Sequence, residues 1–111
     1  MLPQVREWLE TLDRLQRRVE ALDRRQAGML GEGYDLGGET INSMIRALAE
    51  FREVANEFRK RQIMIKDLRR GLIDFPSLRE GKEVFLCWEK DEEDIEFWHD
   101  LESGFAGREK L

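Results

Sequence analysis

The sequence predicts an α+β fold, in which a long antiparallel helical hairpin is followed by a small antiparallel β-sheet packed on it. Three observations lead to this prediction. Two long segments carry apolar residues at alternating steps of three and four, which is the spacing of one helix face. A glycine-rich stretch separates these segments, and after Gly71 the pattern changes to short apolar runs bounded by Gly, Pro and Asp. With 111 residues, the chain is expected to form a single domain, 1–111.

The first helix is expected over residues 1–27 and the second over residues 40–62, joined by a connection, 28–39, that holds five of the nine glycines. Each helix has about 23 residues and a length of roughly 35 Å, so the two match as antiparallel neighbours. Both carry a heptad-like apolar face. These faces consist of Val5, Trp8, Leu12, Leu15, Val19 and Leu22, and of Ile41, Met44, Leu48, Phe51, Ala55 and Phe58.

The small sheet is expected within residues 63–111. Its predicted strands cover 63–68, 72–75, 84–88 and 95–98, and an acidic hairpin tip covers 90–94. Residues 77–80 match the S-x-x-E capping box, which predicts a single helical turn there. The run 84–88 is apolar on both faces, so it is predicted to be a central strand covered on both sides.

The apolar face of the predicted hairpin is wider than one partner helix covers. The residues that flank the predicted seam are Leu9, Ile45, Ala47 and Val54. Either the C-terminal segment folds back over them or a second copy of the chain covers them and forms a four-helix bundle, and both are expected. The leading hypothesis from the sequence is therefore a non-enzymatic homo-oligomeric interaction module, most simply a homodimer with a coiled-coil-like core.

The charge distribution excludes some classes of partner. The formal net charge is −5, and the counts by segment are +1 for 1–27, −3 for 28–39, +4 for 40–71 and −7 for 72–111. Nucleic-acid binding needs a continuous positive face, which the scattered arginine clusters do not form. No apolar run approaches the roughly 18 residues of a membrane span, and the first residues do not resemble a signal peptide, so a cytoplasmic protein is expected.

The one histidine, His99, lies beside Asp100 and just after a predicted strand. One hypothesis is a divalent-metal or acid–base site formed by Asp67, Asp74, His99 and Glu102, because imidazole and carboxylates suit such an ion at neutral pH. In the alternative, the ring of His99 hydrogen-bonds a backbone carbonyl or a carboxylate. The aspartates would then cap turns or form ion pairs with the neighbouring basic residues Lys66, Arg70 and Arg108.

A wider candidate ligand patch adds Trp88, Trp98 and Arg108 to these four residues, because two indole rings and a guanidinium could line a small-molecule pocket. In the alternative, the two tryptophans are core or inter-subunit aromatics and Arg108 anchors the tail to Asp74 or Glu102. The single cysteine, Cys87, excludes an internal disulfide and a zinc site built from several thiolates. Its place in an apolar strand favours a structural role over a nucleophile activated by His99. No cofactor is expected apart from the divalent metal of that hypothesis.

Over essentially its whole length, the chain resembles a bacterial family catalogued as domain of unknown function 2203, and the recognisable motifs are all C-terminal. The motifs that carry the resemblance are Lys-Asp-Leu at 66–68, Gly-Leu-Ile-Asp-Phe-Pro at 71–76, Leu-Cys-Trp at 86–88, Trp-His at 98–99 and Gly-Phe-Ala-Gly-Arg at 104–108. The resemblance implies the predicted architecture and places these motifs in one patch. It implies no reaction, ligand or partner.

Overall fold

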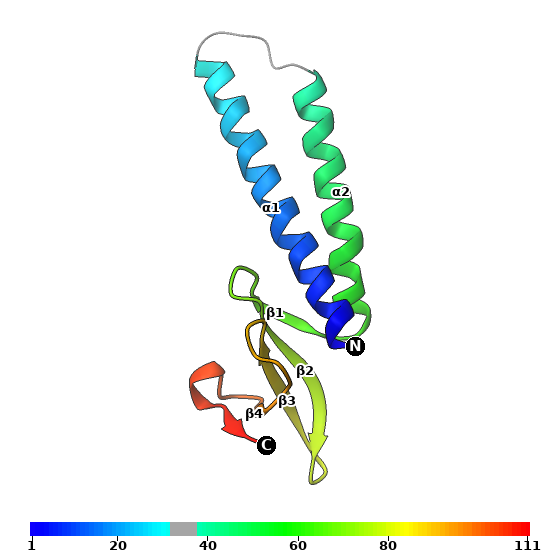
Figure 1. Cartoon of the computed structure of the whole chain (residues 1–111), viewed down its shortest axis with the longest axis vertical. Helices are drawn as coiled ribbons and strands as arrows, with labels where there is room; N and C mark the ends of the chain where they lie inside the picture. The colour runs from blue at the N-terminus through cyan, green and yellow to red at the C-terminus, as the bar shows by residue number, and fades with distance from the viewer. Residues whose placement is uncertain (32–37) are drawn as a thin grey trace. The chain divides into compact units, whose positions relative to one another are not determined.

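The computed structural model describes residues 1–31 and 38–111, and it confirms the α+β fold (Figure 1). No helix within these two ranges is long and apolar enough to cross a membrane. The elements in chain order are α1 (Leu2–Gly31), α2 (Gly38–Lys60), β1 (Met64–Asp67), β2 (Leu72–Arg79), β3 (Lys82–Glu89), β4 (Phe97–Asp100), the 3₁₀ turn η1 (Phe105–Gly107) and β5 (Glu109–Lys110). The chain divides into two compact units, and α1 and α2 each contribute residues to both.

The first unit, Glu7–Asn56, is the helical hairpin. The side chains of Leu9, Leu12 and Leu15 of α1 and of Ala47 of α2 are buried in it. The predicted seam of α2 is wrong at one residue, Leu48, which is half exposed while its neighbour Ala47 is buried; the predicted seam residue Phe58 is buried. Leu48 and Ala47 are both apolar and adjacent in the sequence, so the pattern alone allowed either of them to face the interior. Helix α1 also extends past residue 27, so Gly28 and Gly31 belong to it; residues 32–37 of the predicted connection lie outside the described residues.

The second unit, Met1–Arg6 with Glu57–Leu111, contains the sheet. Its five strands follow one another in the order β1-β2-β3-β4-β5, and all pairs are antiparallel. The helix ends supply Val5 and Phe58 to its apolar core, to which the strands add Ile73, Val84 and Trp88. Burial of these side chains stabilises the unit by roughly 1.5–3 kcal/mol for each large residue.

Strand β2 is longer than predicted, and the expected helical turn at 77–80 is wrong. Residues 77–79 pair with β3, and the reversal falls at Glu80 and Gly81, whose φ angles are 52° and 78°. Two consecutive residues in the left-handed region form the type of two-residue turn that matches the twist of a hairpin. The S-x-x-E pattern is satisfied by sequence alone, but eight cross-strand pairs outweigh a single turn of helix.

Strand β4 begins two residues later than predicted, at Phe97, so that His99 lies within the strand and not after it. The preceding acidic loop is held by Arg6, whose guanidinium donates to the carbonyl oxygens of Lys90 at 2.6 Å and Glu92 at 2.8 Å. The same guanidinium lies 4.8 Å from the centre of the Trp88 ring, and Trp88 Nε1 donates to the Glu92 carbonyl at 3.0 Å. These contacts tie residues 90–93 to Arg6 and Trp88.

Candidate functional site

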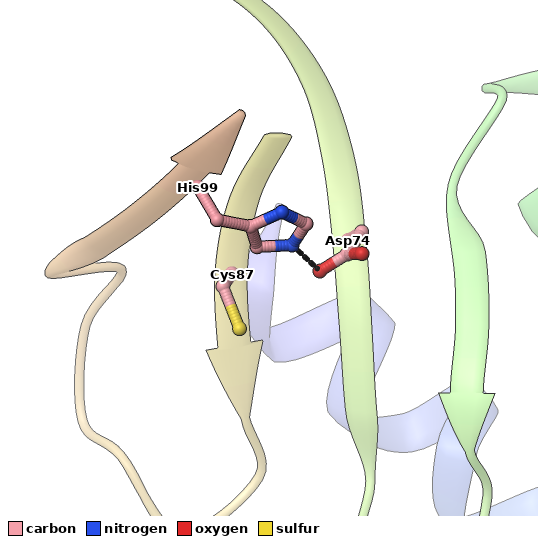
Figure 2. A group of neighbouring side chains, drawn as sticks. All are labelled: Asp74, Cys87 and His99. Carbon is pink, nitrogen blue, oxygen red and sulfur yellow. Dashed lines mark ion pairs between the residues drawn. The ribbon is translucent and has the colours of Figure 1, made fainter. Parts of the chain in front are cut away.

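The strand register puts three chemically versatile side chains on one face of the sheet. Asp74 of β2 is paired with Cys87 of β3, and Phe85 of β3 is paired with His99 of β4. Directly paired residues point to the same side of a sheet, and so do residues two apart along a strand. Asp74, Cys87 and His99 therefore share one face of the sheet (Figure 2). Trp88 follows Cys87 directly along β3, so this core residue lies on the opposite face.

Asp74 and His99 form a buried pair. Nε2 of His99 lies 3.0 Å from Oδ1 of Asp74, and the two residues are only 4% and 2% exposed. The other ring nitrogen, Nδ1, lies 2.8 Å from the backbone carbonyl oxygen of Asp100. The ring of His99 thus contacts both a backbone carbonyl and a carboxylate, which are the two contacts named in the alternative to a metal site.

Cys87 completes this cluster and is 1% exposed. One donor atom from each of Asp74, Cys87 and His99 can be chosen so that all three lie within 4.8 Å of one another. Burial raises the pKa of the Cys87 thiol above its ordinary value, and the Asp74 carboxylate raises it further, while a hydrogen bond from Arg108 opposes both. The thiol is therefore protonated at neutral pH and is a poor nucleophile.

A cavity of about 270 Å³ lies against the same face. Its lining includes Asp74 and His99, together with Lys66, Phe85, Leu101 and Glu102. A neighbouring groove of about 720 Å³ shares Phe85 and Leu101 with the cavity, and its other apolar residues are Pro76, Leu78 and Val84. The polar cavity and the more apolar groove thus adjoin at two residues.

Asp100 organises the segment that closes one side of the cavity. Its Oδ1 accepts hydrogen bonds from the backbone N–H of Glu102 at 3.0 Å, and from the backbone N–H and the hydroxyl of Ser103 at 2.7 Å and 2.9 Å. The Ser103 backbone bond is the main reason that the pKa of Asp100 lies below its ordinary value. Sequence reasoning missed this role, although Asp followed three residues later by Ser is a pattern for such a turn.

The other residues of the predicted patch lie elsewhere in the unit. Asp67 accepts a hydrogen bond from the backbone N–H of Arg70 at 3.1 Å, so it caps the turn between β1 and β2. Trp98 is paired with Leu86 across β3 and β4, and Trp88 lies two residues along β3 from Leu86, so both indole rings are on the opposite face of the sheet. They do not form a wall beside His99.

Arg108 lies near the site but is engaged by neighbours. Its Nη1 is 3.1 Å from Oε1 of Glu92, and its guanidinium lies 3.9 Å from the centre of the Phe97 ring and 4.2 Å from that of Phe105. These contacts hold Arg108 as a bridge between the tail and the sheet. Of the seven patch residues, Asp74, His99 and Glu102 line the cavity.

The comparison with protein families agrees with the motifs noted in the sequence. A family model described as an uncharacterized conserved protein, DUF2203, matches residues 1–111. The chain belongs to this family. In this DUF2203 chain, the motif 71–76 begins one residue before β2 and continues along it, and the motifs 86–88 and 98–99 lie on β3 and β4. These are the three strands that carry Asp74, Cys87 and His99. No curated protein and no solved structure matches the chain.

Proposed function

We propose that this protein binds a small molecule in the cavity over β2, β3 and β4, with the Asp74–His99 pair as its polar anchor. The observation that supports this function is the cavity itself, whose lining includes two buried polar side chains from different strands. Small-molecule sites are concave, with a few placed polar groups among apolar ones. Buried polar groups of this kind are costly to place unless they are paired.

The shape of the site favours a ligand with a small polar end and an apolar body. The polar end would occupy the cavity, where Lys66 and Glu102 offer opposite charges. The apolar body would lie in the groove over Phe85, Leu78 and Leu101. Leu78 and Leu101 are both more than half exposed, so a ligand there would remove apolar surface from water.

We propose that the cavity binds its ligand without catalysing a reaction. The pKa of Cys87 is raised, which disfavours a thiolate, and Cys87 is not among the residues that line the cavity. A cytoplasmic location is part of the same proposal, since a lone cysteine as a free thiol suits a reducing compartment.

The test uses octanoate, octylamine and octanol as probes, with amide chemical shifts of the ¹⁵N-labelled full chain as the measurement. Binding should shift the amides of Phe85, His99 and Leu101 first. Leu101→Ser should weaken the binding of every probe about tenfold, because a buried leucine contributes roughly 1.5–3 kcal/mol. Leu111→Ser is the matched control, since Leu111 is 54% exposed against 53% for Leu101 and does not line the cavity or the groove. Equal weakening in both variants, or shifts spread over the whole chain, would contradict the proposal.

Self-association is a second candidate function, and the exposed apolar side chains of α2 favour it. Ile45 and Leu48 are 58% and 50% exposed, one helical turn apart. Leu48 also borders an apolar groove of about 290 Å³ between the two helices, which includes Val19 and Phe51. Leu9 and Ala47, named from the sequence as interface residues, are buried within the hairpin, and Val54 is half buried.

We propose for this surface a second copy of the chain, because a two-fold axis would bring two identical stripes together and convert two hairpins into a four-helix bundle. Light scattering at micromolar concentration should then give twice the monomer mass of 13.2 kDa. Leu48→Glu should restore the monomer, whereas Leu78→Glu, at the exposed Leu78 of the sheet unit, should leave the dimer intact. A monomer mass for the unmodified chain would rule out this candidate.

A further inference from the structure

We propose that Asp74, Cys87 and His99 form a binding site for a divalent transition metal, and that Zn²⁺ is the ion that suits them best. The site differs from the metal hypothesis based on the sequence, which named Asp67 and Glu102 and left Cys87 out. It does not depend on the binding of a small molecule in the cavity.

The three donor atoms already converge. They come from three adjacent strands and lie within 4.8 Å of one another, and Nε2 of His99 is 3.0 Å from Oδ1 of Asp74 (Figure 2). Zinc bonds of about 2.0–2.3 Å to O, N and S in a tetrahedral arrangement place donors roughly 3.3–3.7 Å apart. Side-chain movements of about 1 Å would therefore bring the donors to the required separation.

The orientation of His99 is a second and independent observation. A carbonyl oxygen can only accept a hydrogen bond, so the 2.8 Å contact with the Asp100 carbonyl assigns the proton to Nδ1. In a neutral ring, Nε2 is then left with its lone pair, and Nε2 is the atom that faces Asp74. Metal-binding histidines are held in this way, with the second nitrogen donating to a backbone carbonyl or a carboxylate.

The same geometry explains how the pair is held when no metal is bound. With Nδ1 protonated and the ring neutral, the lone pair of Nε2 would face a carboxylate oxygen at 3.0 Å, and the two would repel each other. One further proton must lie between the two atoms, which makes the pair either an imidazolium with a carboxylate or an imidazole with a carboxylic acid. A metal ion would take the place of this shared proton.

The charges of the three donors balance those of a divalent ion. A carboxylate and a thiolate neutralise two positive charges, and the imidazole remains neutral, so the buried site carries no net charge when filled. The mixed oxygen, nitrogen and sulfur set suits zinc, which is borderline soft. Asp74 and His99 also line the cavity, so a fourth position on the metal would open toward it, as in zinc sites that keep a water or a substrate.

The experiment titrates Co²⁺ into the full chain after treatment with a chelator, and then displaces it with Zn²⁺. Cobalt is the spectroscopic probe, because a thiolate ligand gives a sulfur-to-cobalt charge-transfer band in the near ultraviolet. We expect one Co²⁺ per chain with this band, and its loss when Zn²⁺ is added. A wild-type chain that binds no Co²⁺, or binds it without the band, would overturn the proposal.

Variants then assign the ligands. Cys87→Ser differs from the wild type by one atom and should abolish the band, and His99→Ala and Asp74→Asn should each raise the Kd for Zn²⁺ by at least about 100-fold, the upper end of what loss of an outer-shell partner costs. Asp67→Asn, which removes a carboxylate from the same sheet, should leave the Kd unchanged. A band that survives Cys87→Ser would show that the absorption does not come from the Cys87 thiolate, and it would refute the site.

Discussion

Replacing His99 by Leu tests whether the buried pair is as tightly coupled as its geometry indicates. The substitution places an apolar side chain of similar length in β4, and it leaves the Asp74 carboxylate, 2% exposed, without its partner at 3.0 Å. Removal of one partner from a buried pair costs about 3–5 kcal/mol, because the remaining charge stays buried. A small domain has a net stability of about 5–15 kcal/mol, so this loss is a large fraction of the total.

The reverse substitution, Asp74→Leu, should cost less. The ring of His99 can lose its proton and stay neutral, and its Nδ1 keeps the hydrogen bond to the Asp100 carbonyl. Only one hydrogen bond of Nε2 is lost, which costs about 1–3 kcal/mol. The double variant, with Leu at both positions, should be close to the wild type, since apolar replacement of a whole buried pair is often neutral.

The assay is urea unfolding at pH 7 in the presence of a chelator, followed by the fluorescence of the three tryptophans, of which Trp88 is fully buried. A double-mutant cycle should give a coupling energy of at least about 2 kcal/mol between positions 74 and 99. A cost below about 1 kcal/mol for His99→Leu, or costs that simply add in the double variant, would refute the reasoning.

Three further predictions concern single positions. The pKa of Cys87 is raised in the folded state, so the protonated thiol stabilises the fold fully below the unfolded thiol pKa of about 8.5, and this stabilisation is lost as the pH rises through the higher folded pKa. In urea unfolding, Cys87→Ala should therefore reduce the loss of stability that the wild type shows above pH 8.5. Gly71→Ala should destabilise the protein by about 1–2 kcal/mol, since φ is 67° and a new Cβ would lie 2.6 Å from the side chain of Lys90. In Gly28→Ala the new Cβ meets nothing within 4 Å, so this change in α1 should be neutral or stabilising by up to about 1 kcal/mol; equal melting temperatures of the two variants would contradict this difference. Asp100→Ala should accelerate amide hydrogen exchange at Ser103, because it removes the acceptor of the Ser103 N–H. In the wild type the slow exchange of this amide should hold above the ordinary aspartate pKa of about 3.9 and be lost only as the pH falls through the lowered folded pKa of Asp100. Unchanged exchange in the variant would exclude the Asp100 turn as the cause of the slow exchange.

The hairpin and the sheet could be predicted because their patterns are repeated over many residues. The apolar steps of three and four persist through α1 and α2, and the strands of the sheet are separated by turn residues. The choice between Leu48 and Ala47 could not be made, since both are apolar and only packing against α1 distinguishes them. The capping-box pattern at 77–80 failed for a related reason, because a local signal cannot reveal that the segment has a partner strand.

The candidate site was predicted only in part. His99 and Asp74 were named because their side chains are chemically distinctive, but their contact depends on the register between β2, β3 and β4. Cys87 was interpreted as a buried structural residue, and it is buried. Its second property, a position directly opposite Asp74 on the adjacent strand, follows from strand pairing and has no signal in the sequence.

The clamp made by Arg6 has a consequence for how the chain can fold. Arg6 and the carbonyl of Lys90 are 84 positions apart, and closing a flexible loop of that length costs about 4 kcal/mol of chain entropy. Prior formation of the helical hairpin would shorten this search, because α1 and α2 return the chain close to its start before the strands are reached. A fragment of residues 57–111 would contain all five strands and yet lack Val5 and Arg6, so we expect it to remain largely unfolded until a peptide of the first residues is added.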